Sequence, residues 1–352
     1  MSGNKLVDME GRPVHIAGVN RMGTEYACIG GRGIFEGPDT SAGNGQTLSA
    51  MLTWDINAVR VPLNEDCWLG SKPGLDPAFT GSKYRAAIGE WVHAITGKGM
   101  VAIVDLHWAA PNGVTADGQQ PMANRDNSPE FWRQVAGTFK DNSGVMFDLF
   151  NEPYIDRDPI GRRQPWAIWR DGGTLTVHNS MQQPTRTTFQ AAGMQELVDA
   201  VRSTGATNPI MLGGLTYAQD LSQLVDFLPR DPAGQLVASF HPYPGRPCAW
   251  TDESCLAEQL DAVMPAMPLV SGELGREDCT TTDVEAILGF LDNHEGGSGY
   301  LAWVWTKTES PCGHDNWGLI RDYFPGTPTT TGAAFQRHFQ NRSDIDDLQE
   351  QP

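Results

Sequence analysis

The chain of 352 residues is poor in basic side chains and has no long apolar run. Its 25 Lys and Arg residues stand against 43 Asp and Glu, which gives a formal net charge of −18. This balance argues against nucleic acid or an anionic membrane surface as a partner. No apolar segment reaches the length that a helix needs to cross a bilayer.

Several motifs that would indicate a bound metal or nucleotide are also missing. The chain has no Cys-x-x-Cys pair, which argues against a zinc site of that spacing. It has no His-x-His pair, and no glycine-rich phosphate-binding turn follows the first predicted strand. We therefore expect neither a metal nor a cofactor.

Six cysteines are present, and an even number in an acidic, Trp-rich chain indicates disulfides and hence secretion. Cys248 and Cys255 are close enough in the sequence to close one loop. Two further pairs, Cys28 with Cys67 and Cys279 with Cys312, would each join loops that follow neighbouring strands. This pairing is one of several that six cysteines allow. Six reduced thiols in a cytosolic enzyme remain the alternative.

Short apolar runs alternate with helical patterns along most of the chain. The runs that read as buried strands are 15–20, 58–63, 101–108, 145–150, 210–213, 236–240, 269–272 and 300–305. Helical patterns lie at 47–54, 83–96, 128–140, 188–203, 221–228, 254–264, 282–294 and 332–340. Near-continuous apolar strands, each followed by a helix, predict an α/β fold, a (β/α)8 TIM barrel of one domain. An open doubly wound sheet is the alternative.

Four segments lie outside this alternation. Residues 6–14 predict a hairpin with its turn at Glu10 and Gly11, so residues 1–14 form an N-terminal hairpin within a catalytic barrel of residues 1–341. Residues 342–352 predict a polar C-terminal tail. Residues 21–46 and 154–187 form long connections after the first and fourth strands. Connections of this length tend to be functional, so we expect both to border one cleft.

Two glutamates stand at the carboxyl ends of predicted strands. Glu152 comes just before Pro153, which stops its strand, and Glu273 follows the run 269–272. Side chains alternate between the two faces of a strand, so both carboxylates can point into the barrel mouth from opposite sides. Two carboxyl groups about 5 Å apart across a sugar ring are what retaining hydrolysis of a glycosidic bond requires.

Polar residues at other strand ends would tune this pair. Arg60 and a hydroxyl from Tyr243 would keep Glu273 ionised. Burial and the charge of Glu273 would keep Glu152 protonated. Asn151 can donate to the sugar hydroxyl beside the reacting carbon.

Two histidines and a tryptophan complete the predicted site. His107 and His241 would orient the carboxylates, and Trp305 would form a flat floor for a sugar ring. Aromatic rings in loops suit sugar stacking or loop packing equally, which applies to Trp68, Trp108, Trp166, Trp169, Trp250 and Trp317.

Structural roles compete with these assignments. Arg60 can simply neutralise the inward-facing Asp105 or Asp148, which parity places too deep to react. His107 can be a satisfied structural histidine. The segment from His241 to Tyr243 can be a plain turn.

The ordered set resembles glycoside hydrolase family 5, whose retaining glycosidases are built on a (β/α)8 barrel. The resemblance runs from Gly18-Val19-Asn20 to Trp303-Val304-Trp305, with Asn151-Glu152-Pro153 as its centre. The family's pattern falls on Arg60, His107, Asn151, Glu152, His241, Tyr243, Glu273 and Trp305.

The resemblance implies that Glu152 is the acid/base and Glu273 the nucleophile, with retention through a covalent glycosyl-enzyme. It implies hydrolysis of a β-linked glycan, either β-1,4-glucan (cellulose-like) or mannan-like. We expect an oligo- or polysaccharide substrate, a secreted monomer, and no nucleic acid or membrane partner. The long loops leave open an exo-acting enzyme on a less common sugar, such as an arabinofuranoside or galactofuranoside. A metal-dependent barrel hydrolase using His107, His241 and the acids, or a non-catalytic carbohydrate-binding barrel, are further alternatives.

Overall fold

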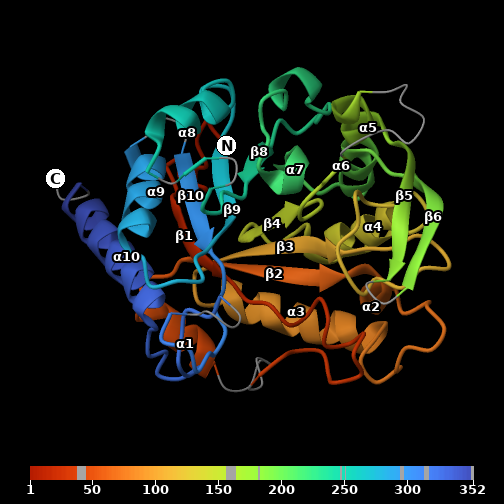
Figure 1. The fold of residues 1–352 in the computed structure, drawn as a ribbon, viewed down its shortest axis with the longest axis horizontal. Coiled ribbons are helices and arrows are strands. Elements are labelled where there is room, and N and C mark those ends of the chain that lie inside the picture. Colours follow the sequence, from red (N-terminus) through yellow and green to blue (C-terminus); the bar gives the residue numbers. More distant parts are fainter. Residues whose placement is uncertain are drawn as a thin grey trace.

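Parallel strands close into a barrel in the computed structural model of the chain (Figure 1). The structure describes residues 1–37, 45–155, 164–180, 183–245, 248–249, 251–293, 297–312 and 317–349. The barrel strands are β1 (Ile16–Asn20), β2 (Ala58–Asn64), β3 (Val101–Trp108), β4 (Val145–Asp148), β7 (Ile210–Gly213), β8 (Leu236–Phe240), β9 (Leu269–Leu274) and β10 (Gly297–Ala302). Each pairs with the next along the chain, and β10 pairs with β1. This closure confirms the predicted (β/α)8 barrel and excludes the open sheet.

The barrel interior changes from apolar to charged towards the strand ends. Each strand contributes one side chain to an apolar cluster: Ile16, Ala58, Ile103, Met146, Met211, Val237, Val270 and Leu301. Leu6 from the N-terminal segment joins this cluster. Two residues further along β2, β3 and β4 stand Arg60, Asp105 and Asp148, all fully buried. Alternate residues share a face, so this charged layer lies between the apolar cluster and the barrel mouth.

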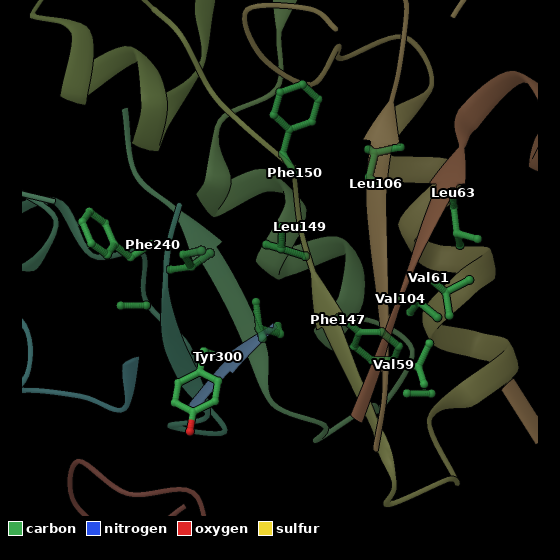
Figure 2. Close-up of a cluster of buried hydrophobic side chains, with 14 of the residues drawn as sticks. Val59, Val61, Leu63, Val104, Leu106, Phe147, Leu149, Phe150, Phe240 and Tyr300 are labelled. Carbon is green, nitrogen blue, oxygen red and sulfur yellow. The ribbon is translucent and has the colours of Figure 1, made fainter. Parts of the chain in front are cut away.

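The outward faces of the strands pack against the helices. Figure 2 shows Val59, Val61 and Leu63 on β2 beside Val104 and Leu106 on β3, within this outer core. The described helices are α1 (Gln46–Leu52), α2 (Glu65–Leu69), α3 (Ser82–Thr96), α4 (Ser128–Phe139), α5 (Pro165–Asp171), α6 (Met194–Arg202), α7 (Leu215–Ala218), α8 (Glu253–Leu260), α9 (Thr282–Asn293) and α10 (Thr330–Gln349). Burying each large apolar side chain contributes roughly 1.5–3 kcal/mol.

Two expected helices are wrong in whole or in part. Residues 183–191 form strand β6 (Gln183–Ala191), so the helix expected at 188–203 begins only at Met194. β-Branched residues such as Thr187 and Thr188 favour a strand when a partner strand is available. The helix expected at 221–228 is reduced to a short 3₁₀ turn, η1 (Val225–Phe227).

The connection after β4 contains regular secondary structure rather than an irregular loop alone. It contains α5 and an antiparallel hairpin of β5 (Gly173–Ser180) and β6, which Figure 1 shows at the edge of the molecule beside α5 and α6. The hairpin is attached to the loop after β3, because Arg125 N donates to Gln190 O (2.8 Å) and Ala192 N to Ala123 O (3.0 Å). Residues 156–163 and 181–182 of this connection, and 38–44 of the connection after β1, lie outside the described residues.

All three expected disulfides are present. Cys28–Cys67 ties the connection after β1 to α2. Cys279–Cys312 joins the connections that follow β9 and β10, and Cys248–Cys255 closes a short loop at α8. Among the residues that the structure describes, none of the helices combines the length and the apolar character needed to cross a bilayer.

The two ends of the chain pack onto the barrel. The N-terminal hairpin pairs Val7 with Pro13 around Gly11, whose φ of 82° is the left-handed conformation that glycine favours. Helix α10 continues through residues 342–349, where we expected a polar tail, and its Arg342 pairs with Asp292 of α9 (2.9 Å). The last three residues, 350–352, lie outside the described part of the chain.

Candidate active site

A cavity of about 810 Å³ lies at the carboxyl ends of the strands, on the side where barrel enzymes carry their sites. Its lining is His107, Gln119, Asn151, Glu152, Tyr217, Gln219, Tyr243, Pro244, Glu273, Arg276, Glu277, Asp278, Trp303 and Trp317. The volume falls in the range of small-molecule sites. Carboxylates, amides and aromatic rings in one cavity are what a sugar ring needs from a protein surface.

Glu152 and Glu273 face one another across this cavity. One carboxylate oxygen of each and Nδ1 of His241 all lie within 4.8 Å of one another. The separation of about 5 Å typical of retaining glycosidases leaves no room for a water between the second carboxylate and the anomeric carbon. The two carboxyl groups are therefore placed for double displacement rather than for direct attack by water.

Glu273, at the end of β9, is held from both sides. Arg60 Nη1 lies 2.8 Å from its Oε1, and the hydroxyl of Tyr243 donates to its Oε2 over 2.8 Å. Arg60 is fully buried and also pairs with the acids of the charged layer, at 3.1 Å from Asp105 and 2.9 Å from Asp148. A single guanidinium therefore contacts both the cavity-lining Glu273 and two buried acids.

Glu152 has neutral partners. Gln119 Nε2 donates to its Oε2 over 2.6 Å, and His241 Nδ1 lies 3.0 Å from its Oε1. Its neighbour Asn151 accepts a hydrogen bond from Arg60 Nη2 through Oδ1 (2.8 Å), which leaves the amide nitrogen for another acceptor. Asn151 lines the cavity.

Burial changes the pKa of both carboxyl groups and of two histidines in the site. Burial raises the pKa of both Glu152 and Glu273. Burial also lowers the pKa of His107 and of His241 to about 4, so both imidazoles are neutral near pH 7. The guanidinium of Arg60, 2.8 Å from Glu273, favours the ionised form of that carboxyl group.

The prediction that Trp305 forms a floor for a sugar ring is wrong. Trp305 is fully buried and packs edge-on against Trp54 (4.9 Å between ring centroids), away from the cavity. Trp303 lines the cavity instead, stacked parallel to His107 at 5.7 Å. Strand β10 ends at Ala302, so the alternation of faces does not extend to the residues beyond it.

The loop tryptophans divide in the same way. Trp317 lines the cavity against Tyr243 (5.2 Å), whereas Trp68, Trp166 and Trp169 are buried in the core. Trp108 packs on Tyr26, and Trp250 lies outside the described residues.

The short element α7, which follows β7, is a strained turn rather than a regular helix, and it contributes a cavity-lining residue that the sequence does not reveal. Thr216, Tyr217 and Ala218 have φ values of 53°, 62° and 58°, a left-handed run that costs roughly 1–2 kcal/mol per residue. Tyr217 N donates to Pro153 O (2.9 Å), and the Tyr217 ring stacks on that of Tyr154 (4.9 Å). These contacts with the segment that carries Glu152 hold the turn in place and set a tyrosine at the cavity wall.

Gln119, Tyr217 and Arg276 line the cavity without having been predicted from the sequence. Gln119 and Arg276 lie in connections and Tyr217 lies in the short α7, where no alternation of faces indicates the direction of a side chain. Arg276 forms ion pairs with two carboxylates, Asp278 (2.6 Å) and Asp283 (2.8 Å). Its positive charge is therefore already neutralised at the edge of the cavity.

A family model, Cellulase (glycosyl hydrolase family 5), matches residues 7–309. The chain belongs to glycosyl hydrolase family 5. This family 5 chain is 25% identical over 238 residues to a probable endo-β-1,4-glucanase B of Aspergillus niger. The match covers 64% of this chain but 56% of that protein, so the chain spans little more than half of its curated relative.

Solved structures share the fold of this family 5 chain at low sequence identity. The β-glucanase SdGluc5_26A from Saccharophagus degradans, in complex with cellotetraose, superposes with a TM-score of 0.67 at 19% identity, over 97% of this chain and 92% of that one. A β-mannanase from Streptomyces thermolilacinus superposes with a TM-score of 0.62 at 17% identity, over 96% of both chains. At this identity the likeness establishes the barrel alone.

Proposed function

We propose that this chain is a retaining glycoside hydrolase that cleaves a β-linked glycan by double displacement. The observation that carries the proposal is the approach of the Glu152 and Glu273 carboxylates to within 4.8 Å over one cavity. Family membership and the names of the relatives support the same reaction.

In the first step, Glu273 attacks the anomeric carbon and Glu152 gives its proton to the leaving glycosidic oxygen. The glycosidic bond breaks as an ester bond to Glu273 forms. In the second step, a water molecule gives a proton to Glu152 and its oxygen to the anomeric carbon, and Glu273 leaves as a carboxylate. Arg60 and Tyr243 stabilise Glu273 as an anion at both ends of this cycle.

The substrate class follows from the lining and from the relatives. Trp303 and Trp317 offer flat faces, and Asn151 offers an amide to a ring hydroxyl. The named relatives act as glucanase and mannanase, which favours a β-1,4-glucan or a mannan over the furanoside alternative. The three disulfides support secretion into an oxidising compartment. We further propose that the protein acts as a monomer with a glycan as its sole partner.

The test is hydrolysis by the purified chain of a panel that contains β-1,4-glucan, mannan, their oligosaccharides and aryl glycosides of pyranoses and furanoses. Glu273→Gln is expected to lower turnover roughly a thousandfold or more without lowering the unfolding midpoint. Turnover that survives both Glu273→Gln and Glu152→Gln would refute the assignment. Release of monosaccharide alone from long chains would favour exo action.

The metal-dependent alternative has one observation behind it, because Glu152, His241 and Glu273 could together ligate a cation. Arg60 already places a positive charge 2.8 Å from Glu273, which makes a second cation at that carboxylate unfavourable. Unchanged turnover after dialysis against excess chelator would support the metal-free reaction. Loss of turnover that returns with one divalent ion would revive the alternative.

A further inference from the structure

The contact between Gln119 and Glu152 is the shortest described hydrogen bond to the proposed acid/base. Gln119 Nε2 lies 2.6 Å from Glu152 Oε2, and the same nitrogen lies 3.4 Å from the backbone oxygen of Glu152. Gln119 comes from the loop after β3, lines the cavity and is half-buried. An amide nitrogen only donates, so this geometry favours the ionised carboxylate.

The loop that carries Gln119 is attached on both sides of it. Tyr154, two residues beyond Glu152, donates through its hydroxyl to Gln119 O (3.3 Å) and through its backbone N–H to Pro121 O (3.0 Å). On the other side, Asn64 at the end of β2 donates to Ala116 O (2.7 Å). These contacts hold the backbone of Gln119 in place relative to the segment that carries Glu152, and so fix the point from which its side chain extends.

We propose that Gln119 is a positioning residue that orients the Glu152 carboxyl group and sets its proton affinity during the reaction. This inference rests on the proposed glycosidase function. In the first step, the amide occupies Oε2 as an acceptor, so that the proton is carried on Oε1. In the second step, it stabilises the carboxylate that accepts the proton of water.

Other charged and titratable groups face Glu152 and are left in place by a change at Gln119. They are His241 and Tyr243 after β8, Glu273 on β9, His107 and Asp105 on β3, and Arg60 on β2. A shift in the titration of Glu152 on changing Gln119 therefore reports the lost hydrogen bond.

The variant Gln119→Met keeps the length of the side chain and removes its N–H donors. Without a donor the ionised form of Glu152 is less stable, so the pKa of Glu152 rises. The basic limb of kcat/KM against pH is then expected to move up by about 0.5–1 unit. For substrates with a sugar leaving group, kcat/KM near the optimum is expected to fall roughly tenfold.

Leaving-group dependence separates positioning from a general structural role. Nitrophenyl glycosides need little proton donation, so their kcat/KM in Gln119→Met is expected to fall less than about threefold. Gln134→Met is the matched control, because Gln134 Nε2 donates to Glu130 Oε1 (3.0 Å) on the surface of α4. An unmoved basic limb, or equal losses for sugar and nitrophenyl leaving groups, would overturn the proposal.

A ¹³C NMR titration of the labelled Glu152 carboxyl, with and without Gln119→Met, tests the contact without turnover. A higher pKa in the variant supports the proposal, and an identical pKa overturns it. If the parent chain hydrolyses no glycan while the NMR shift appears, the proposed function fails and the contact stands. If glycans are hydrolysed and no shift appears, only the role of Gln119 fails.

Discussion

At the scale of single residues, Arg60 is a buried cation shared by three carboxyl groups. Its guanidinium contacts Glu273, Asp105 and Asp148, and it is fully buried. The sequence offered two readings of this arginine, neutraliser or functional partner. The alternation of faces along a strand could not choose between these two roles. The side chains of β2, β3, β4 and β9 meet at one place, so Arg60 contacts all three carboxylates at once.

Removing this charge is expected to destabilise the fold as well as the site. Arg60→Met leaves buried acids without a counter-charge, which costs about 3–5 kcal/mol in the free energy of unfolding. Urea denaturation at pH 7 measures the loss. The control is Arg12→Met, whose ion pair with Asp8 is exposed to solvent and is expected to add little to stability. Equal losses in the two variants would contradict this role of Arg60.

At the scale of elements, the sequence predicted the direction of side chains inside the strands but not beyond the strand ends. Inside the strands, the alternation of faces correctly predicted that Arg60 and Asp105 point into the barrel. The eight apolar runs correctly predicted the barrel itself. Beyond the strands the alternation stops: β10 ends before Trp303, and the prediction exchanged Trp303 for Trp305. Gln119 and Tyr217 were missed for the same reason, because the backbone paths that follow β3 and β7 depend on distant contacts.

The two tryptophans beyond β10 give opposite expectations. Trp303→Ala is expected to weaken substrate binding with a small effect on stability, since its ring lines the cavity. Trp305→Ala removes a buried ring that packs on Trp54 and is expected to cost about 3–5 kcal/mol in unfolding free energy. Urea denaturation and KM for an oligosaccharide, measured on both variants, check the pair. A larger loss of stability in Trp303→Ala would contradict the placement.

The disulfides are expected to contribute to the free energy of unfolding to different degrees. Cys279–Cys312 spans 33 residues and Cys248–Cys255 spans 7. If each bond acts by restricting the unfolded chain, replacing the first pair by alanine costs about 1.4 kcal/mol more than replacing the second. Urea denaturation of the two double variants under oxidising conditions measures the difference. The reverse order would show that native contacts, rather than loop length, dominate.

At the scale of the whole molecule, buried acids make the stability of the fold depend on pH. An apolar cluster, a charged layer and an open mouth succeed one another along the barrel axis. Further buried acids lie outside the barrel: burial raises the pKa of Glu25 and of Glu65 to about 8. Glu65 accepts from Ser128 Oγ and Asn124 Nδ2 (2.7 Å), which joins α2 to the segment that begins α4.

Stability is therefore expected to fall as the pH rises from about 5 to 8. In that window the folded state holds protons on Glu25 and Glu65 that the unfolded chain has released, so unfolding free energy decreases with pH. Each group contributes up to about 1.4 kcal/mol per pH unit. Urea denaturation across the range measures the slope. Glu65→Gln should flatten it and the exposed Glu130→Gln should not; an unchanged slope in Glu65→Gln would contradict this role of Glu65.

The carboxylate pair is tested most directly by the stereochemistry of hydrolysis. Proton NMR of the anomeric region, recorded within the first turnovers on the preferred β-linked glycan, shows which anomer forms before mutarotation. Two displacements at one carbon, through Glu273, predict that the β-anomer forms first. If the α-anomer forms first, one water attacks directly, and the roles given to Glu152 and Glu273 are wrong.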